Sequence, residues 1–190
     1  LEEMLQVKDW KGVALKDALA QALKVAPAPM REGTPGFALD GYVEAHIEQG
    51  PRLENEKKTI GVVTAIQGSR RYLVEILGEE AHAGTTPRAA RKDAFAAALR
   101  IAQAMYDATT DKDDTLRFTI GRVDVGPGSP NTVPGKTSFT IDMRHPSDAV
   151  LEAHEKKLHE IVAVKAAPCS ASIERVMAVA PTDFAPLVID

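Results

Sequence analysis

The feature that most constrains the fold is a series of six segments between Arg71 and Ala180, whose apolar spacing changes between two periods. In four segments apolar residues recur at every second position, as in a half-buried strand. In the other two they recur every three or four residues, as on one face of a helix. The order is strand, helix, strand, strand, helix, strand. This order predicts an α+β, ferredoxin-like β-α-β-β-α-β domain with a four-stranded antiparallel sheet and two helices.

The boundaries of these elements follow from the spacing and from turn residues. The predicted strands are 71–78, 116–125, 135–144 and 169–179, and the predicted helices are 91–108 and 147–165. Outside the domain the pattern predicts a helix at 15–23, a proline-rich and glycine-rich loop at 25–36 and a β-branched strand at 57–68, whereas 42–54 fits either a strand or a helix.

Composition excludes several classes of function. The 190 residues carry a formal net charge of −4, which lacks the clustered positive charge that nucleic-acid binding requires. No apolar stretch is long enough for a membrane helix, so we expect no membrane partner. The single cysteine, Cys169, cannot form an intrachain disulfide and fits a reducing cytoplasm. We therefore expect a cytoplasmic protein with small-molecule or protein partners.

A histidine in a turn is the first candidate for chemistry. His82 lies in "GEEAHAGTTPRAARKDA", among small residues and just before an alanine-rich helix. A local hydroxyl or carbonyl that held one ring nitrogen would fix the tautomer and aim the other nitrogen at a ligand. A capping turn with a merely exposed histidine is the alternative.

A long connection between two predicted strands is the second candidate. "GPGSPNTVPG", from Gly126 to Gly135, is longer than a plain hairpin requires, and its prolines imply a rigid loop around Asn131. The alternative is an elongated hairpin loop without a binding role.

Two further motifs carry polar groups. In "DMRHP", Arg144 shares the polar face of a strand with Asp142, and its guanidinium could grip a carboxylate or form only a surface ion pair. In "HIEQGP", His46 is a candidate metal ligand and Gln49 offers an amide, although a surface turn explains both. His154 and His159 are five residues apart on a helix and make a poor metal pair.

Taken in order, "EAHIEQGPRLE", "GEEAHAGTTPRAARKDA", "GSPNTVPG" and "DMRHP" resemble the signature segments of one family. These are the metal-dependent amidohydrolases of the metallopeptidase superfamily that include N-carbamoyl-L-amino-acid hydrolases, β-ureidopropionases and allantoate amidohydrolases. The resemblance runs from about Gly41 to Pro181.

The resemblance implies a subunit with an α/β catalytic domain and an inserted lid or dimerisation domain. Residues 1–67 would be part of the catalytic domain, 68–180 the lid domain, and 181–190 the return into the catalytic domain. It further implies cleavage of an N-carbamoyl-L-amino acid or related ureido acid by a homodimer, with a pair of divalent metals such as zinc, manganese, cobalt or nickel.

Residue roles follow from the same resemblance. His46 matches a metal ligand, and Gln49 lies in the substrate pocket. His82 matches a catalytic histidine that also binds substrate and stabilises an oxyanion. Asn131 and Arg144 match the residues that hold the substrate's carboxylate.

The chain also departs from the family pattern. Arg88 stands where the family usually carries methionine, and the resemblance implies that the remaining metal ligands and the general base lie outside the chain. We therefore expect an incomplete metal site and an inactive piece of a longer enzyme, a view that the non-methionine start at Leu1 also favours.

Two other readings stay open, namely an aminopeptidase or deacylase of the same superfamily and a non-catalytic dimerisation module. A homodimer is expected in either case, because an open sheet leaves unpaired edges. We expect the small face of the first domain helix to pack against the partner; its residues are Ala90, Ala94, Ala97 and Ala104.

Overall fold

The structure is a computed structural model that describes residues 2–25 and 41–186. It divides into two compact units, Leu1–His46 and Ile47–Asp190, and each is described by itself. In the first unit α1 (Glu2–Leu5) and α2 (Leu15–Val25) are joined by a turn that a Lys8–Ala14 bridge closes. The helix predicted at 15–23 is confirmed, while most of the loop predicted at 25–36 lies outside the described residues.

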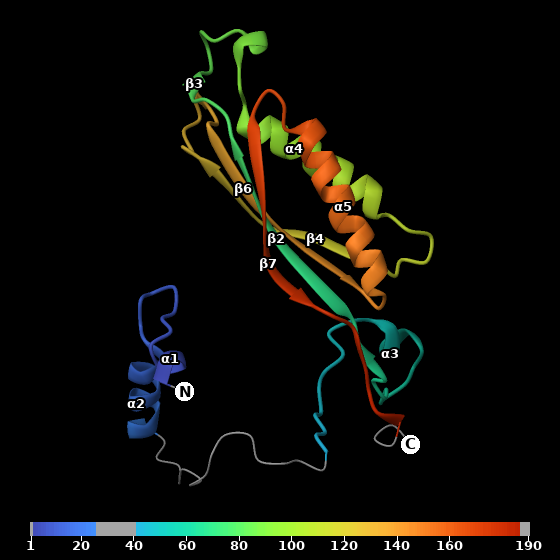
Figure 1. Cartoon of the computed structure of the whole chain (residues 1–190). Helices are drawn as coiled ribbons and strands as arrows, with labels where there is room; N and C mark the ends of the chain where they lie inside the picture. Colours follow the sequence, from blue (N-terminus) through green and yellow to red (C-terminus); the bar gives the residue numbers. More distant parts are fainter. Residues whose placement is uncertain (1, 26–40, 187–190) are drawn as a thin grey trace. The chain divides into compact units, whose positions relative to one another are not determined.

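An antiparallel sheet of four strands is the centre of the second unit. Its strands are β2 (Gly68–Leu77), β4 (Arg117–Gly126), β6 (Lys136–His145) and β7 (Ser170–Val179), in the order β4-β6-β2-β7. Two helices, α4 (Ala94–Thr109) and α5 (Asp148–Lys165), lie side by side on one face of the sheet (Figure 1). The predicted ferredoxin-like α+β fold is therefore confirmed.

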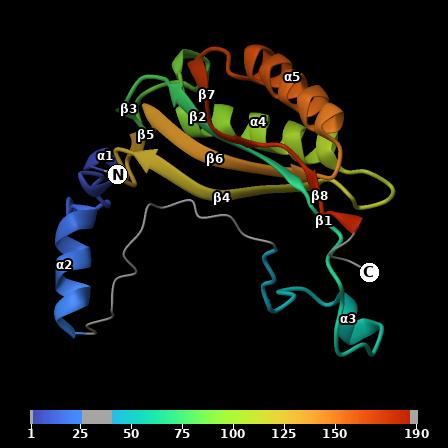
Figure 2. The same ribbon diagram turned by 60° about the horizontal axis from the view of Figure 1, so that its bottom comes forward.

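Alternation along the strands places the core between the sheet and the helices. In β2 the side chains of Tyr72, Val74 and Ile76 are fully buried, and the residues between them face away from the helices. The neighbouring strand β6 and the two helices supply the other large buried side chains, which are Phe139, Ile141, Met143, Ile101, Met105, Leu151 and Leu158. The second face of the sheet carries no helix in the described residues of this unit (Figure 2).

The two helices begin differently. At α4 the Asp93 carboxylate accepts a hydrogen bond from the Ala96 N–H at 2.9 Å, a standard N-terminal cap. At α5 the N-terminal residue Ser147 forms no cap with its side chain, although serine is a common capping residue. Instead the Ser147 N–H donates to His145 Nδ1 at 2.8 Å, because β6 ends directly beside the helix start.

The prediction of a strand over 57–68 is largely wrong. Only β1 (Ala65–Ile66) is a strand there, paired with β8 (Thr182–Asp183). A strand needs a hydrogen-bonded neighbour, and among the described residues only the short β8 lies beside this segment. The ambiguous stretch 42–54 forms neither long element and contains only the start of the short α3 (Arg52–Asn55).

The face of α4 that turns outward is not the one we expected. Ala94 and Ala97 are fully buried against the chain's own sheet, and Ala104 packs against the same core, so these residues do not form a face for a partner. Ala90 is exposed but lies before α4 begins. Leu99 and Tyr106, seven residues apart on another stripe of α4, are 55% and 46% exposed. The small residues serve close packing of the helix on its own sheet, and the larger apolar ones remain at the surface.

Within the described residues, no helix combines the length and the apolar character that crossing a membrane requires.

Burial of Tyr72 predicts a stability change at high pH. Burial raises the pKa of the Tyr72 phenol, so the neutral form is favoured in the folded state. Its stabilisation is fully present below pH about 10, the usual tyrosine value, and is lost as the pH rises further. Above that pH the unfolding free energy should fall more steeply in the wild type than in Tyr72→Phe, by up to about 1.4 kcal/mol per pH unit.

Urea unfolding of both chains between pH 9 and 11.5 measures this difference. Equal slopes would show that the Tyr72 phenol ionises as readily in the folded chain as in the unfolded one.

Candidate functional site

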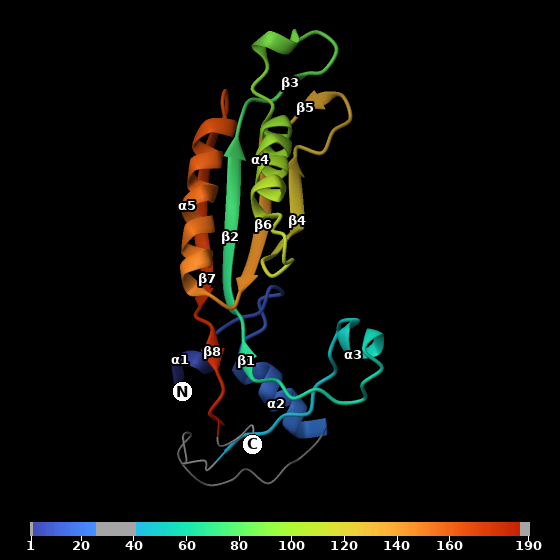
Figure 3. The same cartoon turned by 90° about the vertical axis from the view of Figure 1, so that its right-hand side faces the viewer.

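A two-stranded arm extends from one end of the sheet. It consists of β3 (Ala81–His82) and β5 (Thr132–Val133), which pair antiparallel with His82 opposite Thr132 (Figures 1 and 3). The Ala83 N–H also donates to the Asn131 carbonyl at 2.9 Å. The arm therefore brings together two of the residues selected from the sequence, His82 and Asn131, although they lie 49 positions apart.

The turn after β3 fixes the state of the His82 ring. His82 Nδ1 accepts hydrogen bonds from the backbone N–H groups of Gly84 at 3.0 Å and Thr85 at 3.2 Å. A nitrogen that accepts cannot carry the proton, so the neutral ring carries it on Nε2. The exposed His82 side chain thus presents an N–H donor. The expectation of a local partner was right, but the partner is backbone N–H rather than a hydroxyl or carbonyl.

The Asn131 side chain is held by its neighbours. Its Oδ1 accepts from the hydroxyls of Ser129 at 2.7 Å and Thr132 at 3.4 Å. Because the oxygen is engaged, the NH₂ group is the end that remains to donate to a ligand. The long loop is therefore stiffened both by β5 and by these side-chain bonds, beyond what its prolines indicate.

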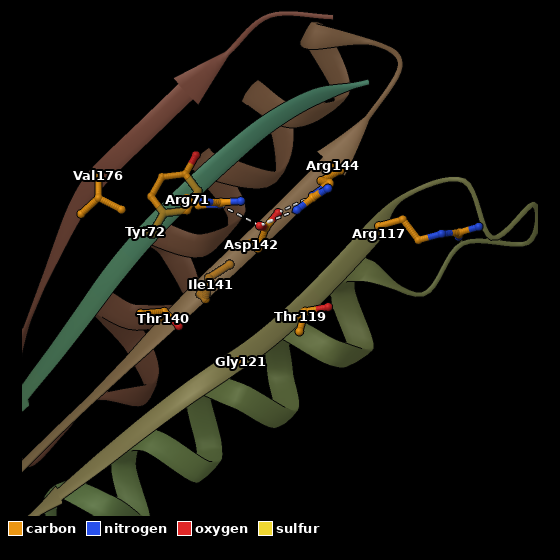
Figure 4. A pocket seen from close by; sticks show the side chains of 10 residues that line it. All are labelled: Arg71, Tyr72, Arg117, Thr119, Gly121, Thr140, Ile141, Asp142, Arg144 and Val176. Atoms are coloured by element: carbon orange, nitrogen blue, oxygen red, sulfur yellow. Dashed lines mark hydrogen bonds and ion pairs between the residues drawn. The ribbon is translucent and has the colours of Figure 1, made fainter. Parts of the chain in front are cut away.

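Arg144 lies at the opposite end of β6, on the open face of the sheet. It donates to Asp142 through Nε at 3.0 Å and Nη2 at 3.1 Å, and Arg71 Nε donates to the same carboxylate at 2.8 Å (Figure 4). Burial of Asp142 would raise the pKa of its carboxyl, but the two arginines outweigh burial and hold that pKa below its usual value. Asp142 stays ionised and orients Arg144.

Arg144 and Gln49 line the same hollow. It has a volume of about 1230 Å³, and Arg71 and Arg117 also line it. Gln49 adopts a positive φ of 53°, which directs the chain sharply into the turn before α3. Glu48, beside it, accepts from the N–H groups of Arg52 and Leu53 at 2.9 Å each, so its carboxylate is engaged in the turn.

Positive charge gathers on this side of the sheet. Arg117 lies opposite Arg144 across β4 and β6, and Arg71 lies opposite Asp142 across β2 and β6. A smaller hollow of about 630 Å³ on the open face is lined by the same three arginines, Arg71, Arg117 and Arg144 (Figure 4). With one carboxylate shared between two of these arginines, the surface suits an anionic ligand.

The sequence did not single out Arg71 and Arg117 as residues that line the same hollow as Arg144. The available signal was strand alternation, because Arg71 lies at an outward position of β2 and Arg117 at one of β4. Their position beside Arg144 and Asp142 depends on strand register, which alternation alone does not specify; the Arg117 side chain itself points away from Arg144 and pairs with Asp114 (Figure 4).

The first unit holds His46, which is exposed and belongs to no helix or strand. Among the described residues, no group of three or more histidine, cysteine, aspartate or glutamate side chains could hold a metal ion. One imidazole alone does not make a metal pair, so the described residues do not fit such a group by themselves. The assignment of His46 as a ligand stays a prediction.

The candidate residues thus form two clusters. His82 and Asn131 lie on the arm beyond the Lys136 end of β6, and Arg144 lies near the other end (Figure 3). Arg144 lies eight positions after Lys136 in a continuous strand, which corresponds to about 27 Å at an antiparallel rise of about 3.4 Å. One chain does not bring the two clusters around one small substrate.

Comparison with known proteins adds the family. The model of the peptidase dimerisation domain family, M20, matches residues 64–168. Allantoate amidohydrolase of Escherichia coli is 41% identical over 158 residues, which are 83% of this chain and 38% of that protein. N-carbamoyl-L-amino-acid amidohydrolase of Paenarthrobacter aurescens is 34% identical over 191 residues, covering 99% of this chain and 46% of that protein.

A solved structure agrees with these matches. The hydantoinase/carbamoylase family amidase from Burkholderia ambifaria is 36% identical and superposes with a TM-score of 0.79, over 100% of this chain and 46% of that one. The chain therefore spans less than half the length of these relatives. The resemblance drawn from the four motifs is confirmed: the chain belongs to the peptidase dimerisation domain family and is related to amidohydrolases of the hydantoinase/carbamoylase type.

Proposed function

We propose that this chain is part of a metal-dependent amidohydrolase that cleaves the C–N bond of N-carbamoyl-L-amino acids or related ureido acids. The products would be the amino acid, CO₂ and ammonia. The observation that carries the proposal is the His82 ring, whose Nδ1 accepts two backbone N–H groups and whose Nε2 is left as a donor on the same arm as Asn131.

The described residues would bind and polarise the substrate. His82 Nε2–H donates to the carbamoyl oxygen, where negative charge develops during attack on the carbon. Arg144, oriented by Asp142, grips the substrate's carboxylate together with the Asn131 amide, and Gln49 lines the same pocket. The divalent metal pair would supply the water-derived nucleophile. His46 is one proposed ligand, and the remaining ligands would come from outside the described residues.

A homodimer would bring the two clusters together. The edge strand β4 carries exposed Val123 and Val125 on the helix side of the sheet, next to exposed Leu99 and Tyr106 of α4. These residues form an apolar strip beside unpaired backbone groups, and a second copy would cover both.

Two-fold symmetry then fixes the relative direction of the two β4 strands. Two β4 edges related by a two-fold axis run antiparallel, so the arm end of one copy lies toward the Arg144 end of the other. The site would take His82 and Asn131 from one copy and Arg144 and Gln49 from its partner. This arrangement accounts for the separation of about 27 Å along β6 in a single chain.

Three further points belong to the same proposal. The lid domain would span 68–180, with 1–67 and 181–190 contributing to a catalytic domain. The 190 residues alone would be inactive, because the described residues include no group of side chains that could hold a metal pair. The enzyme would work in the cytoplasm, consistent with a single, half-buried Cys169.

The test uses the complete enzyme with divalent metal and a panel of N-carbamoyl-L-amino acids and allantoate. Arg144→Ala should lower kcat/KM by about 100-fold or more, because a bidentate carboxylate contact is lost. Arg175→Ala is the matched control: Arg175 is another exposed arginine of the sheet, on the opposite edge strand β7, paired with Glu155 at 3.1 Å, and should change kcat/KM less than about threefold.

Turnover of N-acyl amino acids or peptides instead of the panel would favour the deacylase or aminopeptidase reading. No turnover of either set by a metal-loaded dimer would favour a non-catalytic dimerisation module.

A further inference from the structure

The turn that carries His82 is stabilised by hydrogen bonds from a residue outside it. Besides the two bonds to Nδ1, the Thr86 N–H donates to the His82 carbonyl at 3.1 Å, which closes the turn. The turn is short and exposed, and a Cβ at Gly84 would lie 3.2 Å from His82 Cε1. Packing alone gives such a turn little support, because few apolar side chains are buried around it.

Arg91 supplies that support from the next segment of the chain. Its Nη2 donates to the Ala83 carbonyl at 2.6 Å and its Nε to the Thr86 carbonyl at 2.9 Å. The two carbonyls lie on either side of Gly84 and Thr85, whose N–H groups hold the ring. A planar guanidinium with donors in a fixed geometry can bridge two such acceptors, which a single ammonium group cannot do equally well.

The backbone of Arg91 is anchored to the body of the domain. The carbonyl of the next residue, Lys92, accepts from the Glu79 N–H at 2.9 Å, and the Lys92 and Glu79 side chains form an ion pair. Asp93 caps α4, whose first residue donates to the Pro134 carbonyl at 2.9 Å. Arg91 therefore connects a fixed base, α4 and the start of β6, to the turn that carries the histidine.

We propose that Arg91 is a positioning residue for His82: by holding the Ala83 and Thr86 carbonyls it keeps the Gly84 and Thr85 N–H groups on Nδ1, and so keeps the ring proton on Nε2. The geometry stands on the described contacts alone. Its meaning for catalysis rests on the proposed function, in which Nε2–H is the donor to the substrate's carbonyl oxygen.

Two readouts on the 190-residue chain test this without any enzyme assay. In a histidine-labelled sample, long-range ¹H–¹⁵N spectra at pH 8.5 distinguish the Nε2–H from the Nδ1–H tautomer, and the His82 signals are assigned by their loss in His82→Asn. Amide hydrogen exchange at Gly84 and Thr85 reports whether their N–H groups remain bonded.

In the wild type we expect a nearly pure Nε2–H tautomer. In Arg91→Ala we expect a mixture of tautomers and exchange at Gly84 and Thr85 that is at least about tenfold faster. Arg91→Lys, which keeps the charge, should fall between the two. Arg88→Ala is the matched control, because it removes an exposed arginine three residues earlier, and it should match the wild type.

An unchanged tautomer and unchanged exchange in a folded Arg91→Ala chain would overturn the proposal. Should Arg91→Ala unfold, the Arg91→Lys comparison decides instead, and wild-type behaviour there would count against a bidentate clamp. The proposed function has a separate test, since full activity of His82→Ala in the complete enzyme would contradict that function and leave the role of Arg91 in fixing the tautomer unaffected.

Discussion

Gly78→Ala should destabilise the sheet domain by about 3 kcal/mol or more. This is the largest stability effect that we expect from adding a single methyl group. A Cβ at position 78 would lie 1.9 Å from the Lys92 carbonyl oxygen and 2.9 Å from its carbon. Both are backbone atoms, and they cannot move away as a flexible side chain could.

The reason for this contact is the crossing at the base of the arm. The Gly78 N–H donates to the Gly135 carbonyl at 2.7 Å, while the Lys92 carbonyl approaches from the segment that leads into α4. Three stretches of backbone, each far from the others in sequence, meet at one point. A side chain there would push α4 away from β2 or displace the backbone where the arm leaves the sheet.

Gly121→Ala is the matched control, because Gly121 also lies in a strand but a Cβ there would meet no atom within 4 Å. It should change the unfolding free energy by about 1 kcal/mol or less, with either sign. Urea unfolding followed by circular dichroism measures both variants. A Gly78→Ala chain as stable as the control would mean that the three segments do not meet as described.

The fold was largely accessible from sequence because each core element has a clear period. β2, β4, β6, β7, α4 and α5 all begin within three residues of the predicted starts. The exceptions depend on partners that a single segment cannot reveal. The run 57–68 has strand propensity, but among the described residues only the short β8 lies beside it, and only Ala65–Ile66 pair with it.

The site could be predicted from sequence only in part, again because it depends on partners that a single segment cannot reveal. The sequence singled out His82 and Asn131 separately, but their meeting depends on the β3–β5 pairing, which no local pattern specifies. The sequence also assigned the small residues of α4 to a dimer surface. Periodicity identifies a face of a helix but not whether that face meets its own sheet or a second chain.

The second large effect concerns catalysis in the complete enzyme. His82→Ala should lower kcat by about 100-fold to 1000-fold, because the donor to the developing oxyanion is removed. Arg144→Ala should lower kcat/KM by about 100-fold through loss of the carboxylate contact. Both variants should stay folded and keep the proposed dimer, since His82 and Arg144 are exposed and neither lies on the apolar strip along β4 and α4.

The two variants can be combined in one dimer. If the site is shared between copies, a heterodimer of His82→Ala with Arg144→Ala contains one site with both residues intact and one site with neither. It should recover about half of the wild-type activity. A heterodimer of His82→Ala with Asn131→Ala is the matched control, because both changes lie on the arm and every site would lose one arm residue.

The measurement that tests the shared site most directly is therefore the activity of purified His82→Ala/Arg144→Ala heterodimers, isolated with two different affinity tags. A shared site predicts recovery to about half of the wild-type rate, with no recovery in the His82→Ala/Asn131→Ala control. A His82→Ala/Arg144→Ala heterodimer as inactive as its two parents would contradict it, and would mean that both residues act within one chain or that neither acts as proposed.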